Sequence, residues 1–288
     1  MYCNALGLAR RFGLKCRFQI VKFLCMAFKH IISRDNAIFK AMKKLAEHAR
    51  ERQKTGQTLL DGVHLIQTYV EVFGEPELLI IPEGKSTAEA THLMQQFADV
   101  DTLMLPTLMF AELSPVTTAT GILALVKIPA LAAPENPKCV LMLEDIQDPG
   151  NLGSMLRTAS AAGVDAVYLS AGCTDAWSPK CLRGGQGAQF LLPVVEKADL
   201  LAEISQFQGQ TLAATMAGES IYQQQFSQST AFVIGNEGNG LRAETIAACT
   251  KPVTIPMTEN RLGKMESLNA GVAAAVMLFE RVRQVLAV

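Results

Sequence analysis

The stretch VLMLEDIQDPGNLGSMLR, residues 140–157, decides the fold of this 288-residue chain. It begins with a short apolar run at 140–143, which is typical of a strand buried on both faces of a sheet. A loop at 144–153, a helical pattern at 154–162 and a second apolar run at 166–170 follow. This alternation predicts an α/β domain in which helices cover both faces of an open parallel sheet.

The same alternation extends in both directions from this stretch. The C-terminal domain, 139–288, is expected to hold further strands at 191–195, 212–216, 232–234 and 253–256, and helices at 200–207 and from about 267. A linker at 129–138 precedes it, because its three prolines interrupt any helix. Residues 33–128 form a small α/β domain, with helices expected at 36–45, 63–73 and 87–97 and strands at 58–60, 78–81, 102–105 and 122–128.

The composition excludes several classes of protein. Hydrophobic residues make up 49% of the chain and charged residues 18%, which is enough for a packed core. No apolar run reaches the roughly 18–20 residues that span a bilayer, so no membrane partner is expected. The seven cysteines include no CxxC pair, and all four histidines precede residue 100. We therefore expect reduced cysteines in a cytoplasmic protein, with no metal centre.

Charge is distributed unevenly along the chain. Residues 1–54 carry 13 basic and 3 acidic side chains, whereas the remainder carries 13 basic and 24 acidic ones. Such segregation predicts that the basic end binds a polyanion, with RNA or DNA as the default and an anionic membrane as the alternative, although a solvated surface face gives the same pattern. The candidate RNA-binding residues lie on or just after the first expected helix: Lys40, Lys43, Lys44, Arg50 and Arg52.

Residues 1–32 are interpreted as a basic extension outside the fold. The first 34 residues contain seven basic side chains and no acidic one, a composition that resembles a transit peptide and would imply mitochondrial import. The favoured explanation is a start codon placed too early, with Met26 as the functional start just before the first organised segment.

Polar and glycine-rich segments follow three of the expected strands, where open parallel sheets bind their ligands. They are DPGNLGSMLRTA (148–159), FVIGNEGNGL (232–241) and the pair IPM (255–257) and ESLNAGVAAA (266–275). The dinucleotide fingerprint GxGxxG is absent from the chain, which disfavours a hydride-transferring oxidoreductase.

In this order, the three segments resemble the SpoU/TrmH-type RNA ribose 2′-O-methyltransferases of the SPOUT superfamily. The resemblance covers the chain from about Ser33, and the N-terminal domain looks like the small RNA-binding domain that often precedes the catalytic one. It implies a trefoil-knotted open parallel sheet, the cofactor S-adenosyl-L-methionine, and a homodimer formed through the knotted domain. Backbone groups and apolar side chains would hold the adenosine, at Gly235, Ile255, Leu268, Ile234 and Met257.

The resemblance also assigns the catalytic residues: Arg157, Asn151, Glu237, Ser267 and Asn269. Arg157 would meet the reacting hydroxyl, but a guanidinium stays protonated, so orientation of the hydroxyl is as plausible as general-base catalysis. Asn151, Ser267 and Asn269 can instead cap helices. Glu237 either anchors Asn151 or Arg157, or binds backbone amides.

The sequence thus predicts a 2′-O-methyltransferase acting on ribosomal RNA, with transfer RNA as a second choice. The alternatives are a noncatalytic RNA-binding or ribosome-assembly protein with the same fold, and a base methyltransferase of the same superfamily. The chain departs from the family between Met257 and Glu266, where an extra piece includes Arg261 and Lys264.

Overall fold

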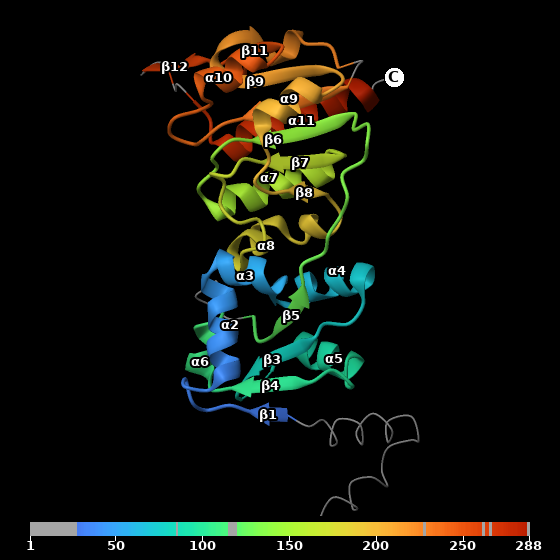
Figure 1. Cartoon of the computed structure of the whole chain (residues 1–288), viewed down its shortest axis with the longest axis vertical. Coiled ribbons are helices and arrows are strands. Elements are labelled where there is room, and N and C mark those ends of the chain that lie inside the picture. The colour runs from blue at the N-terminus through green and yellow to red at the C-terminus, as the bar shows by residue number, and fades with distance from the viewer. Residues whose placement is uncertain are drawn as a thin grey trace, which may run out of the picture. The chain divides into compact units, whose positions relative to one another are not determined.

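The computed structural model describes residues 28–84, 86–114, 120–226, 229–260, 263–264 and 267–286. The chain divides into two compact units, Met1–Ile128 and Pro129–Val288. Figure 1 shows a sheet with attached helices in each of them. The extra basic residue Arg261 and the start of the extension, 1–27, lie outside the described residues.

The first unit is built on a mixed five-stranded sheet with the order β1-β4-β3-β5-β2. The pairs β1–β4 and β3–β4 are parallel, whereas β5 runs antiparallel to both β3 and β2. Its strands are β1 (Phe28–His30), β2 (Gln57–Asp61), β3 (Leu78–Pro82), β4 (Thr102–Leu105) and β5 (Leu123–Lys127). The small α/β domain expected from the sequence is therefore present.

The helices of the first unit begin and end at recognisable signals. The Asn36 side chain accepts a hydrogen bond from the Ile38 amide (2.9 Å) and starts α2, while Gly74 ends α4. The helices of this unit are α2 (Ala37–Glu47), α3 (Ala49–Thr55), α4 (Val63–Phe73), α5 (Ala88–Gln96) and α6 (Thr107–Ala111). Of these, α3 and α6 were not predicted from the sequence.

The boundary drawn at residue 32 is wrong. Residues 28–30 form the edge strand β1, which pairs with β4 in parallel. The next residue, Ile31, is only 4% exposed and belongs to the core of the unit. The fold therefore includes at least the last five residues of the proposed extension, because an edge strand and a core side chain depend on them.

The second unit contains a six-stranded sheet in which every neighbouring pair is parallel, in the order β11-β9-β10-β6-β7-β8. Its strands are β6 (Cys139–Leu143), β7 (Ala166–Leu169), β8 (Val194–Val195), β9 (Gln210–Ser220), β10 (Thr230–Ile234) and β11 (Lys251–Thr254), and a separate hairpin joins β12 (Glu259–Asn260) to β13 (Gly263–Lys264). The parallel sheet confirms the expectation from the apolar runs.

Helices cover both faces of this sheet. Leu200 and Ile204 of α9 pack on Val140 and Met142 of β6 together with Leu241, whereas α7 and α11 contact each other and α11 contacts β10. Because side chains alternate along a strand, Leu141 and Leu143 face the opposite layer from Val140 and Met142. The helices are α7 (Pro149–Ala161), α8 (Pro179–Gly185), α9 (Leu200–Gln206), α10 (Ala243–Ala248) and α11 (Ala270–Leu286), with 3-10 turns at η2 (Ala188–Phe190) and η3 (Ile221–Gln223).

Helix α7 begins five residues earlier than the sequence analysis expected. Asp148 accepts a hydrogen bond from the Asn151 amide (2.8 Å), and Pro149 occupies the first turn, where a missing N–H costs nothing. Asp148, not Asn151, therefore caps this helix, and Asn151 lies within its first turn. No described helix is long and apolar enough to cross a membrane.

Candidate active site

Three polar side chains from distant segments meet at the carboxyl edge of the second sheet. Asn151 of α7 donates a hydrogen bond from Nδ2 to Glu237 Oε1 (3.1 Å). Asn269, which precedes α11, donates from its own Nδ2 to Asn151 Oδ1 (3.1 Å). The Asn269 Oδ1 atom accepts hydrogen bonds from the amides of Gly271 (2.9 Å) and Val272 (3.3 Å). We call Glu237, Asn151 and Asn269 the amide relay.

The carboxylate fixes the orientation of both amides in the relay. An ionised Glu237 only accepts hydrogen bonds, so the NH₂ group of Asn151 must face it. The carbonyl of Asn151 then faces Asn269, whose NH₂ group must point back. This leaves the Asn269 carbonyl for the first turn of α11, where it caps two amides. Each Asn is thus held in one orientation by its partners.

Glu237 is itself anchored by the loop that follows β6. Its carboxylate accepts hydrogen bonds from the amides of Gln147 (3.2 Å) and Asp148 (3.3 Å) as well as from Asn151. Burial raises the pKa of Glu237, but the hydrogen bonds from its own amide, from Asn151 and from the two loop amides outweigh burial and lower it. Both alternatives considered for Glu237, a side-chain anchor and backbone binding, therefore apply together.

Arg157 and Ser267 lie outside the relay. Arg157 is an exposed residue of α7. Six residues at about 100° each place it roughly 120° around the helix from Asn151. No hydrogen bond joins Arg157 to the described members of the relay, so Asn151 does not hold Arg157 here. Ser267 is exposed, two residues before Asn269.

The 235–241 loop, which carries Glu237, closes on itself. Asn236 and Gly240 exchange two backbone hydrogen bonds (3.1 and 2.9 Å), and the Asn236 side chain accepts from the amides of Gly238 and Asn239. A Cβ atom on Gly235 would collide with the Gly240 carbonyl group and the Leu241 amide nitrogen. Gly235 is therefore required by the loop itself, and a side chain as bulky as Val at this position would disturb the fold of the loop.

The candidate cofactor residues border the same edge of the sheet. Ile234 ends β10, is 3% exposed, and its carbonyl accepts from the Glu144 amide (2.9 Å). Ile255 and Met257 are half-buried in the segment after β11. Leu268 is 38% exposed just before Asn269. In the strand order β11-β9-β10, the segment with Ile255 and Met257 leaves the sheet two strands away from the 235–241 loop.

A bulge in β9 was missed by the sequence analysis. Pro252 of β11 pairs with Ala213, but the next residue, Val253, pairs with Glu219. Residues 214–218 therefore leave the ladder at the carboxyl edge, and the Thr254 hydroxyl donates to the Met216 carbonyl (3.3 Å). The Met216 side chain is 77% exposed. The strand predicted at 212–216 ended before the ladder resumes at Glu219. The glycine at 218 was the one residue in this segment that could have indicated an irregular strand.

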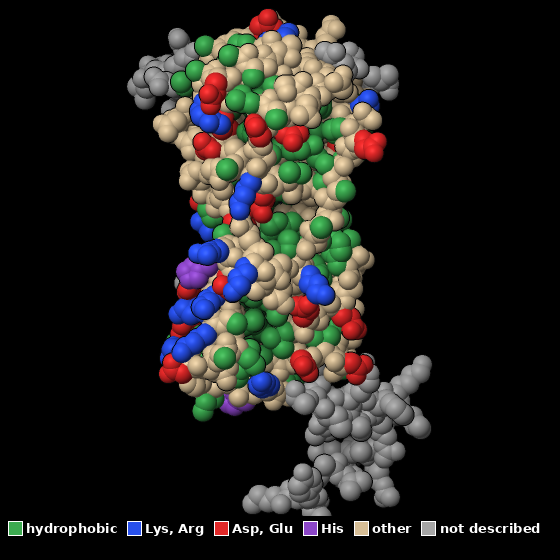
Figure 2. All heavy atoms as spheres, in the orientation of Figure 1, with side chains coloured by type: hydrophobic (Ala, Val, Ile, Leu, Met, Phe, Trp, Pro, Cys, Tyr) green, Lys and Arg blue, Asp and Glu red, His purple; other side chains and the backbone are tan. Residues whose placement is uncertain are grey.

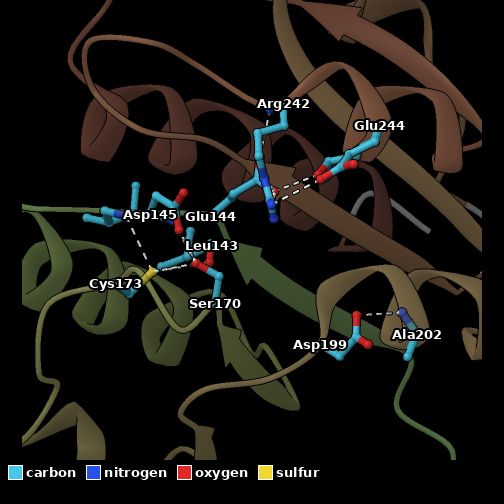
Figure 3. Close-up of polar contacts among 11 residues, drawn as sticks. Leu143, Glu144, Asp145, Ser170, Cys173, Asp199, Ala202, Arg242 and Glu244 are labelled. Carbon is cyan, nitrogen blue, oxygen red and sulfur yellow. Dashed lines mark hydrogen bonds and ion pairs between the residues drawn. The ribbon is translucent and has the colours of Figure 1, made fainter.

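A second polar cluster fixes the exit of β6 (Figure 3). Asp145 adopts φ +56°, a conformation that is unusual for residues other than glycine. The Ser170 hydroxyl donates to Asp145 Oδ1 (2.6 Å), and the Asp145 amide donates back to the hydroxyl (2.9 Å). The turned backbone lets the Asp145 carbonyl accept from Asn236 Nδ2 (2.8 Å). Burial raises the pKa of the neighbouring Cys173 thiol, which donates to the Leu143 carbonyl.

The predicted RNA-binding cations of the first unit have different surroundings. Lys40 pairs with Asp35 (2.8 Å), and Lys43 pairs with Glu112 (2.8 Å). Lys44 and Arg50 are exposed. Figure 2 shows Lys and Arg side chains gathered on the side of this unit where Figure 1 draws α2 and α3.

The prediction that Arg52 contacts RNA is wrong. It is 3% exposed, and its guanidinium donates to the carbonyls of Leu45 and Ala46 (3.2 Å to the latter). A cation there satisfies the carbonyl end of α2 and complements its dipole. Arg52 therefore supports the fold of the unit and is not available to a phosphate. Within the described part of the chain, no group of three or more His, Cys, Asp and Glu side chains could hold a metal ion.

Two family models match the chain. Residues 138–279 match the SpoU rRNA Methylase family, and residues 36–124 match an MRM3-like substrate binding domain. An uncharacterized tRNA/rRNA methyltransferase of Synechocystis is 32% identical over 88% of this chain and 93% of its own length. The 23S rRNA (guanosine(2553)-2′-O)-methyltransferase RlmP of Bacillus subtilis is 34% identical over 87% of this chain and 98% of its own length.

Solved structures show the same fold. The crystal structure of an RNA 2′-O ribose methyltransferase matches with a TM-score of 0.76 and 28% identity, over 90% of this chain and all of that one. The SpoU methyltransferase AviRb of Streptomyces viridochromogenes, in complex with AdoMet, matches with a TM-score of 0.75 and 26% identity, over 87% of this chain and 98% of that one.

Proposed function

Because the chain belongs to the SpoU rRNA methylase family, we propose that it transfers a methyl group from S-adenosyl-L-methionine to a ribose 2′-hydroxyl of ribosomal RNA. The observation that carries this proposal is the amide relay at the carboxyl edge of the parallel sheet. The near full-length similarity to RlmP supports ribosomal RNA over transfer RNA, and a ribose hydroxyl over a base.

The side chains at this edge fit S-adenosyl-L-methionine. Half-buried Ile255 and Met257, together with the exposed side chains of Leu268 and Met216, offer apolar contacts for the adenosine. Backbone groups of the β9 bulge and of the 235–241 loop, at the same edge of the sheet, supply polar contacts for a base edge. When bound, the cofactor supplies a methyl group activated by a sulfonium.

Asn151 orients the ribose in this mechanism. An amide has two N–H donors and a carbonyl with two lone pairs, and the relay uses one of each. Asn151 thus keeps one donor and one lone pair for a hydroxyl, held in a fixed direction. In-line transfer depends mainly on such positioning of the attacking oxygen.

Arg157 positions the RNA and does not accept the hydroxyl proton. Its guanidinium stays protonated, so it binds the attacking oxygen or an adjacent phosphate. Glu237 is also unsuited as the base, because its carboxylate already accepts hydrogen bonds from Asn151 and from backbone amides, and its pKa is lowered. The proton passes to solvent or to an RNA phosphate.

The first unit binds RNA through Lys44 and Arg50. The MRM3-like substrate binding domain match at 36–124 supports this role for the unit. Both side chains are exposed, and each phosphate contact releases counterions from the nucleic acid. Lys40 and Lys43 contribute less, since each is already held by a carboxylate.

The second unit forms a homodimer and carries the trefoil knot of its superfamily. An apolar stripe on α11 supports the dimer: Val272, Phe279 and Leu286 are spaced by seven residues and are 49%, 46% and 78% exposed. A Phe279→Glu variant that stays dimeric by light scattering would remove this stripe from the interface. The knot is supported by the match of residues 138–279 to the SpoU rRNA Methylase family.

The proposed function is tested by nucleoside mass spectrometry of ribosomal RNA from a strain that lacks the gene. Loss of one 2′-O-methylated nucleoside is expected. Loss of a base-methylated nucleoside would identify a base methyltransferase instead. An unchanged modification profile in ribosomal and transfer RNA would favour a noncatalytic assembly role. Location in the cytoplasm is expected if residues 1–25 are dispensable, whereas import of a fluorescent fusion would indicate a mitochondrial protein.

A further inference from the structure

A buried carboxylate lies at the end of β6, next to the loop that carries Glu237. Glu144 is 1% exposed. Its Oε2 accepts from the Arg242 amide (2.8 Å), and its Oε1 accepts from Arg242 Nε (2.9 Å) and from the Thr245 hydroxyl (2.6 Å). Arg242 Nη2 lies 2.8 Å from the same Oε1 atom. Figure 3 shows the side chains of Glu144 and Arg242 pointing toward each other.

These bonds hold the exit of the 235–241 loop, since Arg242 is the residue that follows it. Asn236 and Glu237, earlier in the loop, are held by residues that directly follow Glu144 in the chain. The Asp145 carbonyl accepts from Asn236, and the amides of Gln147 and Asp148 donate to Glu237. The start, the middle and the exit of the loop are therefore fixed by one short segment, 144–148, and the exit is held by the ion pair between buried Glu144 and half-exposed Arg242.

We propose that Glu144 is a positioning residue for the methyl donor, acting through Arg242 on the backbone of the 235–241 loop. This inference rests on the proposed function, because it assumes that the loop binds S-adenosyl-L-methionine. A loop released at its exit still folds around Gly235, but it samples more conformations, so binding must pay for ordering it. Glu144 therefore sets cofactor affinity without touching the cofactor.

Glu244, the second carboxylate that pairs with Arg242, provides a matched control for Glu144. The Arg242 guanidinium lies between two carboxylates, with Nη1 3.0 Å from Glu244 Oε1 on the outer side. Glu244 is 57% exposed, whereas Glu144 is 1% exposed. Exposed ion pairs contribute little, because both ions are well solvated when apart. The two carboxylates share one partner and differ in burial.

The experiment compares Glu144→Gln with Glu244→Gln by calorimetric titration with S-adenosyl-L-methionine. The Gln side chain keeps the shape of Glu144, and half-exposed Arg242 can turn to water, so no charge is stranded in the core. We expect Glu144→Gln to raise the Kd about tenfold, which corresponds to about 1.4 kcal/mol, the scale of a lost charge-assisted hydrogen bond. Glu244→Gln should stay within about twofold of the wild type.

Two further readouts separate positioning from a merely structural role. At saturating cofactor, kcat of Glu144→Gln should stay within about threefold of the wild type while KM for the cofactor rises. Amide hydrogen exchange in residues 236–241 should accelerate in this variant and not in Glu244→Gln. If Glu144→Gln does not fold, Thr245→Val removes one donor to Glu144 and should raise the Kd about threefold.

Wild-type affinity in a folded Glu144→Gln variant, or equal effects of the two substitutions, would overturn the inference. Failure of the proposed function is a different result. In that case the wild-type protein itself would not bind S-adenosyl-L-methionine, whereas the exchange comparison would still report whether Glu144 orders the loop.

Discussion

Asn269→Asp separates the two roles that Asn269 has in the structure. Asn269 Oδ1 caps α11 through the amides of Gly271 and Val272, and its Nδ2 donates to Asn151. An Asp side chain caps a helix as well as Asn does, so the free energy of unfolding should change by less than about 0.5 kcal/mol. Asp has no N–H to donate, however, and both ends of the relay are then carboxylates. Whichever way the Asn151 amide turns, one of its two bonds is lost.

The expected cost in rate follows from that lost orientation. Misplacing a reacting group by about 1 Å lowers a rate by about 10²-fold, so methyl transfer by Asn269→Asp should fall by about that factor. Urea unfolding and single-turnover transfer of labelled methyl to ribosomal RNA measure the two quantities. Asn269→Ala is the control, since it loses the cap as well and should cost about 1 kcal/mol of stability. If Asn269→Asp turns over like the wild type while Asn269→Ala is slow, capping is the only role of Asn269 and the relay has none.

Other predictions concern single sites. Arg157→Ala should keep cofactor affinity within a few-fold yet lower methyl transfer by about 10²-fold, and Arg157→Lys should rescue little; near-normal turnover of the Ala variant in a methyltransferase assay would make it a surface residue. Gly235→Ala should lower the melting temperature and cofactor affinity together, because the added Cβ meets the loop backbone; a variant with normal calorimetric binding would contradict the close contact. Exchanging both Lys44 and Arg50 for Gln should weaken RNA binding. It should also reduce the slope of log affinity against log salt concentration by up to about two, and an unchanged slope would mean that these cations form only a solvated face. The pKa of Glu237 is lowered in the fold, so its hydrogen bonds stabilise the protein above the ordinary carboxyl pKa of 4.5 and lose that effect as pH falls through the folded value. The stability difference between wild type and Glu237→Gln should therefore shrink in acid, and a difference independent of pH would show that ionisation of Glu237 is not involved.

The sequence predicted best where apolar residues follow a regular period. Helix α4 was expected at 63–73 and strand β4 at 102–105, and both have these bounds. Helix α3 was missed because its sequence, ARERQKT, has no apolar period, and the side chain that it buries is a charged one, Arg52. The start of α7 was placed too late because the apolar period begins at Leu152, whereas Asp148 and Pro149 start the helix by capping.

The residues of the site could be predicted from the sequence, but their arrangement in space could not. The resemblance named Asn151, Glu237 and Asn269, but these residues are separated by 86 and 118 positions along the chain. No local pattern shows that they form one directed series of hydrogen bonds. Glu144 carried no motif at all. Its role emerges only from the contact with Arg242, 98 residues away.

The most direct test is methyl transfer by the purified protein to ribosomal RNA that lacks its modifications, with a deuterated methyl group on S-adenosyl-L-methionine. Digestion to nucleosides followed by mass spectrometry locates the label. We predict one 2′-O-methyl nucleoside that carries the deuterated methyl on its ribose, and none with the Asn151→Ala variant. Label on a base, or no transfer by a protein that binds both RNA and S-adenosyl-L-methionine, would contradict the proposed function.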